Sequence, residues 1–428
     1  MIKKILPVAF LFFFSFSALR AQETPPPENW KPAGEVGGTD TMSGKESEPE
    51  KKAPTEAPAP EKWQPAGEIT PPAPTAGAGQ AGLIPRPMFK YGDFELNVFG
   101  RLQPLVGIVG DDAHTSNGDT LSRDGFRLRR ARLGVAGQLM KNWTYELQLD
   151  LADEYNGGSV LLDAVIGWHP TSYAWLDFGA QKVPFGRQQM TSFSELQFIE
   201  RAPWEAVERA AGAAILDPGR QMGITLGGRV WLLDWWAGVY NGARGFSLGD
   251  VNDGLLYALR LQIGSEDLGA AEADLEGGGF RWGVGLGGYL NQAESFEVRA
   301  ASADAAAKWR GLSLRAEGLW AKAIPDARPE GTGTIPGESE RWCMYAQAGY
   351  VLPLNLEPVK LELAARFSIL DDNVHLDDEG DLWEVVGGIN LYLRGNDLKF
   401  MLDYIVKEER HGRSLSNDAV LGMLQLRF

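Results

Sequence analysis

The sequence contains two clusters of basic residues that could bind anions. The first holds four arginines within a strand-like stretch: Arg127, Arg129, Arg130 and Arg132. The second occupies the segment 182–218 and its edges: Lys182, Arg187, Arg201, Arg209 and Arg220. Guanidinium and ammonium groups form strong hydrogen bonds with carboxylates, phosphates and other small anions. These residues are therefore the candidates for contact with anions.

Acidic residues accompany the second cluster in equal number. They are Glu195, Glu200, Glu205, Glu208 and Asp217. A ring of one charge selects ions of the opposite charge, so an even mixture predicts weak or position-dependent ion selectivity. For the arginines of 127–132, two interpretations stay open and do not exclude each other. They are contact with anions and ion pairs with Glu146, Asp150 or Asp163.

The sequence gives only weak signs of catalysis. The four histidines (His114, His169, His375 and His411) fall in separate predicted turns and loops, and none has the i, i+4 spacing of a metal-binding pair. There is no Gly-x-Ser-x-Gly nucleophile elbow and no phosphate-binding Gly-Lys-Ser loop. The glycines of 283–288 lie within a predicted strand rather than between a strand and a helix, so they do not form a dinucleotide loop. We expect no catalytic residue, no cofactor and no metal site.

The elements that must position these residues are strands. In 143–151 and again in 359–369 the odd positions are apolar, while the even positions are mostly polar or charged. A period of two gives each strand one apolar and one polar face. The apolar face meets a second sheet in a soluble sandwich, or lipid in a membrane barrel whose polar face lines water.

Sixteen candidate strands can be counted, an even number as bacterial single-chain barrels require. They are 94–109, 124–139, 143–151, 160–168, 173–181, 219–230, 233–240, 256–264, 280–290, 301–310, 312–323, 342–352, 359–369, 384–393, 396–406 and 418–428. Their connections alternate between long and tight, as in outer-membrane barrels, which places both chain ends on the periplasmic side. One connection, 265–279, is long and acidic where a tight turn is expected. Either that turn is unusual or the count is wrong there.

The chain divides into three predicted regions. Lys3, Lys4, an apolar run over 5–19 and a small residue at position 21 predict a signal peptide over 1–21. Segment 22–88 is rich in Pro, Ala, Glu and Gly, so we expect a disordered periplasmic tether. Beyond the signal no apolar run approaches the roughly 18 residues of a membrane helix, so 89–428 can span a membrane only as a closed barrel. The predicted fold is therefore all-β, a transmembrane antiparallel barrel of about sixteen strands.

Other features of the sequence bear on partners. The tether repeats one motif, at 28–36 and 61–69, either as a duplicated linker or as a tryptophan-containing contact with a periplasmic partner such as the cell wall. A net charge of −16 argues against binding to nucleic acid. Cys343 is the only cysteine, so no disulfide within the chain is possible, and we expect a small packed side chain.

The segment 182–218 is the longest predicted loop between two strands, and it has too many aromatic and apolar residues for a disordered loop. It contains Phe185, Phe193, Phe198 and Trp204. Loops of this length are usually functional or disordered, and a sixteen-stranded barrel is wide enough to hold an aqueous channel. We expect this loop to fold inward as a constriction, the alternative being an ordered external loop.

The phase of the stretch 124–139 follows from its apolar positions. If Ala131, Leu133 and Val135 face lipid, Arg130 and Arg132 face the lumen. Arg127 and Arg129 then lie near the membrane edge or beside a bulge.

Several motifs resemble a known family. The last strand ends on Phe428, like the C-terminal signal of outer-membrane proteins. The stretch 125–134 (GFRLRRARLG) resembles the first signature of the phosphate-selective porin O and P family. The stretches 179–186 (GAQKVPFG), 191–192, 198–201 (FIER) and 218–224 (PGRQMGI) resemble later ones.

The resemblance implies a trimeric sixteen-stranded porin that passes anions. It places Arg129, Arg130 and Arg132 in a basic wall and Lys182, Arg187, Arg201 and Arg220 in the constriction. From the composition of the loop itself, we expect Glu195, Glu200 and Glu205 to be the acidic residues of the constriction. We expect passive diffusion of small ions or polar solutes across the lipid of a bacterial outer membrane, with a preference for anions. The alternatives are a barrel enzyme acting on lipid, for which no serine–histidine pair at a barrel rim is visible, and a structural tether to the cell wall.

Overall fold

The computed structural model describes residues 88–110, 124–152, 161–204, 216–242, 254–292, 296–325, 339–354 and 356–428. All of them belong to one compact unit, Ala66–Phe428. The predicted signal peptide and, apart from Met88, the predicted tether lie outside the described residues, so their nature and the boundaries of the three regions remain predictions.

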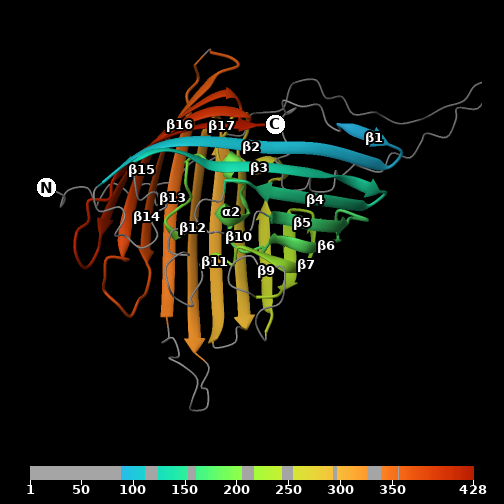
Figure 1. Cartoon of the computed structure of the whole chain (residues 1–428), viewed down its shortest axis with the longest axis horizontal. Helices are drawn as coiled ribbons and strands as arrows, with labels where there is room; N and C mark the ends of the chain where they lie inside the picture. The colour runs from blue at the N-terminus through green and yellow to red at the C-terminus, as the bar shows by residue number, and fades with distance from the viewer. Residues whose placement is uncertain are drawn as a thin grey trace, which may run out of the picture. The chain divides into compact units, whose positions relative to one another are not determined.

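The described residues form a closed antiparallel barrel of sixteen strands, β2 to β17 (Figure 1). Each strand pairs with its neighbours in sequence, and β17 pairs with β2 from Ala419↔Val109 to Arg427↔Arg101. A short additional strand, β1 (Phe89–Tyr91), pairs with the start of β2. The barrel strands are β2 (Phe94–Val109), β3 (Gly125–Met140), β4 (Trp143–Asp150), β5 (Leu161–Trp168), β6 (Trp175–Lys182), β7 (Arg220–Val230), β8 (Leu233–Tyr240), β9 (Leu256–Gly264), β10 (Arg281–Gln292), β11 (Phe296–Trp309), β12 (Leu312–Pro325), β13 (Ser339–Val351), β14 (Lys360–Asp371), β15 (Leu382–Arg394), β16 (Leu398–Glu409) and β17 (Ala419–Arg427).

The strand count predicted from the sequence is confirmed, and most boundaries agree within two residues. The main correction concerns β11, which begins at Phe296 rather than at 301. At its start the polarity is inverted. Val298 and Ala300 are buried on the lumen side, while Glu297 and Arg299 form an ion pair on the outer side. The period-two rule assumes lipid outside and water inside, and it fails where the strand rises past the lipid and its inner face packs against protein.

The two faces of the barrel differ in polarity. Large apolar side chains point outward, with Leu286, Phe367 and Ile389 between 45% and 62% exposed. The inner face carries buried polar side chains, among them Arg130, Glu362 and Lys399. An apolar outer band meets lipid and a polar interior meets water or polar protein, as in outer-membrane barrels. None of the helices among the described residues is long and apolar enough to cross a bilayer.

The connections on one end of the barrel are mostly tight. Asn142, Trp231 and Arg310 each adopt a positive φ in a two-residue turn, and Arg310 is followed by Gly311 with a φ of +89°. Two consecutive residues with positive φ match the right-handed twist of the flanking strands, and glycine adopts that conformation without strain. The connection 265–280 is at this same end. The strand count there was correct, and the turn itself is unusual because its middle is buried, as described below.

The orientation of β10 gives a direct test of the lipid-facing surface. We expect Leu286→Arg, near the middle of this strand, to lower the free energy of unfolding by about 2 to 4 kcal/mol, because a charge would enter the apolar band. Equilibrium unfolding by urea in phospholipid vesicles measures this change. Leu286→Met is the matched control and should behave as wild type. Equal stability of the arginine variant would mean that this face does not contact lipid.

Candidate pore constriction

The connection between β6 and β7 lies inside the barrel. Its described parts are 183–204 and 216–219, with a four-residue helix α2 (Arg187–Met190) and a 3-10 turn (Phe193–Glu195). Figure 1 shows α2 in front of the strands β10 to β12. The loop spans from one side of the wall to the other. Arg260 on β9 donates to the Phe185 carbonyl at 2.6 Å, and Lys399 on β16 donates to the Leu196 carbonyl at 2.7 Å.

Three lumen carboxylates hold the backbone and side chains of this loop. Glu317 accepts hydrogen bonds from the backbone N–H groups of Arg187 and Gln188 at 2.5 and 3.0 Å. Asp403 accepts from the Ile199 N–H at 2.7 Å, and Glu362 accepts from the Gln197 side chain at 2.6 Å. Buried backbone donors need partners, and these strands supply them. The loop is therefore fixed by the wall rather than by secondary structure of its own.

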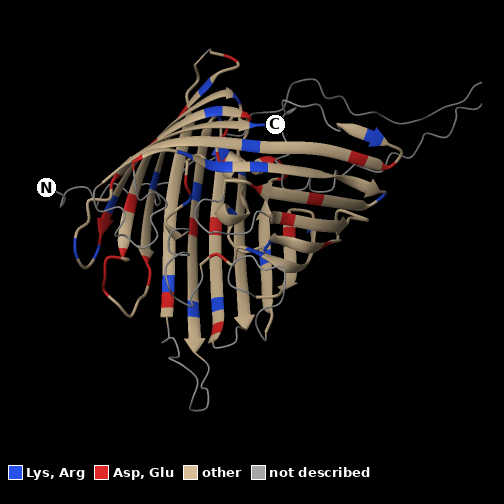
Figure 2. Ribbon diagram, in the orientation of Figure 1, with Lys and Arg blue, Asp and Glu red and all other residues tan. Residues whose placement is uncertain are grey.

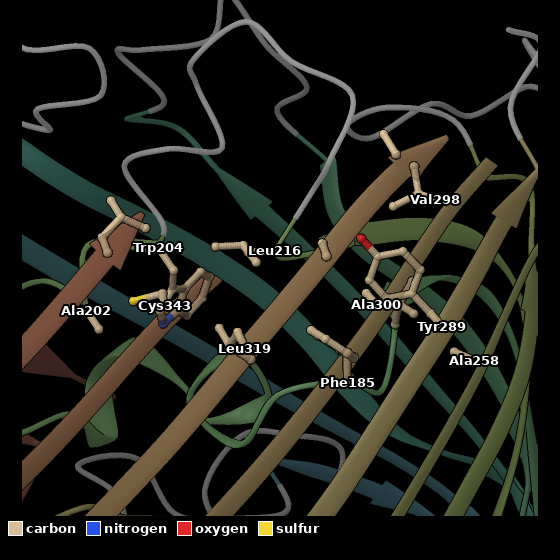
Figure 3. Packing of buried hydrophobic residues seen from close by; sticks show 14 of the residues in the cluster. Phe185, Ala202, Trp204, Leu216, Ala258, Tyr289, Val298, Ala300, Leu319 and Cys343 are labelled. Atoms are coloured by element: carbon tan, nitrogen blue, oxygen red, sulfur yellow. The ribbon is translucent and has the colours of Figure 1, made fainter. Parts of the chain in front are cut away.

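Apolar packing and one close approach complete the fixation. Phe185 and Trp204 are buried against Tyr289, Leu319 and Cys343 on the strands β10, β12 and β13 (Figure 3). Gly287 faces the same part of the loop, and a Cβ at that position would come within 2.4 Å of the Phe185 carbonyl oxygen. A glycine in a strand often marks such a close backbone approach. Gly287 thus makes room for the loop, and Cys343 is a packed side chain in this cluster.

The unusual turn 265–280 meets the loop inside the barrel from the opposite end. Glu272 is fully buried, and its N–H donates to the Glu195 carbonyl at 2.8 Å. One oxygen of its carboxylate accepts from the Gln197 N–H and from the Gln347 side chain, both at 2.9 Å. The other lies 3.6 Å from the Arg315 guanidinium. The constriction is therefore built from two connections that enter the lumen from the two ends.

The basic residues predicted on β3 all occur near the lumen. A register shift opposite Gln103 and Pro104 leaves Arg129 as an extra residue, so the predicted bulge is present. Arg129 and Arg130 both bind Glu200 of the loop, at 2.5 and 3.0 Å, and Arg132 binds Asp150 at 2.7 Å. The bulge turns two consecutive arginines inward. Ion pairing, one of the two interpretations left open, is therefore present at these three residues.

The basic residues predicted in the loop and at its edges are also engaged. Lys182 donates to the Gln189 carbonyl at 2.8 Å, near the end of α2. Arg187 binds Asp304 at 2.5 Å, and Arg220 binds Asp163 in a bidentate pair at 2.9 and 3.1 Å. Arg201 donates to two loop carbonyls and lies over the Phe193 ring at 3.9 Å. These side chains stabilise the shape of the constriction, and their contact with solutes remains a prediction.

The predicted acidic residues follow the same pattern where they are described. Glu195 accepts hydrogen bonds from Asn396 at 2.8 Å and from Arg427. Glu200 bridges the loop to β3 through Arg129 and Arg130. Glu205, together with Glu208 and Arg209, lies outside the described residues.

Arg101, which its place in the sequence does not mark as special, faces the lumen with two N–H groups that have no acceptor. Arg101 on β2 is opposite Arg132 on β3 and opposite Arg427 on β17, so three arginines form a row across adjacent strands. Arg132 and Arg427 have carboxylate partners. Arg101 is 7% exposed, and its Nε and Nη1 groups have no hydrogen-bond partner. The phase of β2 places Arg101 inward, but only the pairing of β2 with β17 reveals the row.

Two cavities flank the turn 265–280. A cavity of about 430 Å³ lies toward β7 to β9 and is lined by four arginines: Arg187, Arg229, Arg260 and Arg315. A smaller cavity of about 80 Å³ lies beside Glu195, Asp274 and Glu276, with Arg281, Lys308 and Arg427 in its wall. The two spaces differ in size and in the balance of charge around them.

A closed barrel with an apolar outer face, a charged interior and an inward loop defines a porin of the bacterial outer membrane. The chain belongs to the phosphate-selective porin O and P family, whose model matches residues 107–275 and 282–428. This match confirms the family suggested by the motifs in 125–134 and 179–224. No curated protein matches the chain.

Solved structures share the fold at low sequence identity. The anion-selective porin from Comamonas acidovorans is 12% identical, with a TM-score of 0.51 over 78% of this chain and 99% of that one. A loop L8 deletion mutant of OmpT, an outer membrane protein of Vibrio cholerae, is 10% identical, with a TM-score of 0.50 and the same coverage. At these identities the similarity concerns the fold alone.

The carboxylate of Glu272, which joins the turn 265–280 to the loop, can be tested by substitution. In Glu272→Ala the Gln197 N–H and the Arg315 guanidinium lose an acceptor, which should lower the free energy of unfolding by about 2 kcal/mol or more. The turn should also detach from the loop and widen the lumen, so single-channel conductance in planar bilayers should rise. Glu276→Ala in the same turn is the control, because that side chain is 73% exposed. Identical conductance of the two variants would show that Glu272 does not shape the pore.

Proposed function

We propose that this porin passes small anions in preference to cations, and that Arg101 is a contact for them inside the lumen. The observation that carries the proposal is the pair of unsatisfied, buried N–H groups on Arg101 within a row of arginines. Leaving a buried charge without partners is costly, and an anion that reaches Arg101 would relieve that cost. The two N–H groups have almost no accessible surface, so the anion must first displace the side chains that cover them. Arg132 and Arg427 add positive potential on both sides, although each is already paired with carboxylates.

The larger cavity supports the same preference. Its four arginines outnumber the acidic residues of its wall, Asp234 and Glu266. Arg187 and Arg260 share the carboxylate of Asp304, and Glu317 lies close to both of them behind the cavity wall. An excess of positive charge around a water-filled space attracts anions. We infer that anions move along the β7 to β9 side of the turn.

Charge removal at Arg101 tests the proposal. A hydrogen bond to a charged group contributes about 1.5 to 3 kcal/mol, so Arg101→Gln should weaken anion binding in the pore about tenfold or more. The concentration at which single-channel conductance saturates in KCl measures that binding. Arg310→Gln removes the same charge from a turn between β11 and β12 and should leave the saturation unchanged. Equal saturation of both variants would exclude Arg101 as an anion contact.

The family assignment favours a channel over an enzyme, and we propose that the protein has no catalytic activity. Two of the histidines in the described part of the chain form hydrogen bonds with side chains. His169 contacts Asp177 and His411 contacts Asp381, rather than a serine. The lipid hydrolase considered from the sequence requires a serine–histidine pair, so this observation disfavours it.

We also propose that the porin is a homotrimer. The strands β6 and β8 have eight residues each, while β11 and β12 have fourteen. At about 3.4 Å per residue and a tilt of about 40°, eight residues rise about 20 Å, less than the roughly 25 Å apolar band of such barrels. A second protomer packed against this low wall would keep it from lipid.

The N-terminal segment 22–88 is proposed to reach the cell wall from the periplasmic side. Deleting this segment while keeping 1–21 should abolish retention on purified peptidoglycan.

The mass of the assembly in detergent, measured by native mass spectrometry, should remain that of three shortened chains. Unchanged retention would refute the tether, and a monomeric mass for the full-length protein would refute the trimer.

A further inference from the structure

Two loops at the end of the barrel opposite the tight turns bring three metal-ligating side chains together. Asp377 and Asp381 belong to the loop after β14, and His411 belongs to the loop after β16. One potential ligand atom from each residue lies within 4.8 Å of the other two. The sequence shows no metal-binding spacing at these positions, because the three residues meet only through the pairing of β15 with β16.

The distances within this group suit a small divalent cation. His411 Nδ1 lies 2.8 Å from an oxygen of Asp381 and 3.6 Å from an oxygen of Asp377. Ligands bound tetrahedrally at about 2.0 to 2.1 Å from Zn²⁺ are roughly 3.3 Å apart, and the two distances bracket that value. The side chains of Asp377 and His411 are partly or largely exposed, so cations from solution can reach the group.

A second observation points to a missing partner. Asp381 is 1% exposed, and its Oδ1 has no hydrogen-bond partner, although its Oδ2 contacts His411. Both oxygens belong to the same carboxylate, so the unsatisfied one is also beside the ligand group. The carboxyl group of Asp371 lies within hydrogen-bonding reach of that of Asp381, and Asp371 and Asp372 each have a buried oxygen that no N–H group approaches. Buried carboxylate oxygens are normally hydrogen-bonded or bound to a metal.

The surrounding charge is strongly negative. The stretch 371–381 contains six carboxylates, and Figure 2 shows the loop that follows β14 as largely acidic. Arg410 is the nearest ion-pair partner of Asp371, at 3.7 Å, and its guanidinium also lies 5.9 Å from the Trp342 ring. Burial and the charges of Asp378, Asp381 and Asp371 raise the pKa of Asp372 to about 6, against the opposing charge of Arg341. A cation would offset this repulsion.

We propose that Asp377, Asp381 and His411 bind a divalent transition-metal cation that joins the loops 372–381 and 410–418. A mixed set of one imidazole and two carboxylates suits Zn²⁺ better than Ca²⁺ or Mg²⁺, which prefer oxygen ligands. A cation at His411 Nδ1 takes the place of the hydrogen shared with Asp381, and the ring then carries its proton on Nε2. The Arg410 N–H already donates to the Asp381 carbonyl at 2.6 Å, so the two loops are held in place before the cation arrives.

Titration of the purified, chelator-treated full-length porin with ZnCl₂ in detergent tests the site. Isothermal titration calorimetry should show saturable binding by wild type. His411→Ala should weaken it about tenfold or more, equivalent to about 1.4 kcal/mol or more. His375→Ala is the matched control, because it removes an exposed histidine from the loop that carries Asp377 and Asp381 without changing the ligand group.

The outcomes separate the proposal from its rivals. Binding by wild type and His375→Ala, with loss in His411→Ala, supports it. Equal Zn²⁺ binding by wild type and His411→Ala would overturn it, as would absence of binding. Binding of Ca²⁺ that His411→Ala leaves intact, without Zn²⁺ binding, would show an oxygen-only cation site in place of the one proposed. Retention of the heat-modifiable barrel band on electrophoresis verifies that each variant is folded.

Discussion

The structure depends on one constraint: a polar loop that enters the barrel must find a partner for each buried backbone group. Glu317, Glu362 and Asp403 supply acceptors from three different strands, and Lys399 and Arg260 supply donors. This explains why the lumen is so highly charged while its ions are mostly paired. The charges of the wall shape the passage first, and only those left unsatisfied after that task are available to solutes.

The two connections that enter the barrel from opposite ends support each other in the constriction. Two hydrogen bonds join the loop and the turn 265–280 at Glu272. Its N–H donates to the Glu195 carbonyl, and its carboxylate accepts from the Gln197 N–H. Arg315 donates to the Ala270 and Ala271 carbonyls of the turn and to the Thr191 hydroxyl of the loop, which ties both parts to β12. The turn also separates two spaces of different size and charge, so the route of ions follows from its position rather than from the diameter of the barrel.

The strands and their number were predictable because the period of two depends on local residue types, as in 143–151. The prediction failed at the start of β11, where Val298 faces protein rather than lipid. At 265–280 it left open whether the turn is unusual or the strand count is wrong, because the burial of Glu272 depends on distant partners such as Gln197 and Gln347, each 75 positions away in sequence. Arg127 to Arg132 were recognised as a cluster because they are adjacent in sequence. Arg101 and the pairing of His411 with Asp381 were not, because strand pairing alone brings those residues to their neighbours.

The most direct test of the account is the reversal potential of the wild-type porin in a planar bilayer that separates two KCl concentrations. The four arginines that line the space beside the turn, together with Arg101, predict a reversal potential with the sign of the chloride equilibrium potential. Its magnitude should fall as the total salt concentration rises, because salt screens these charges. A potential of the sign set by potassium would contradict anion preference. Absence of any current from the folded protein would contradict the channel itself.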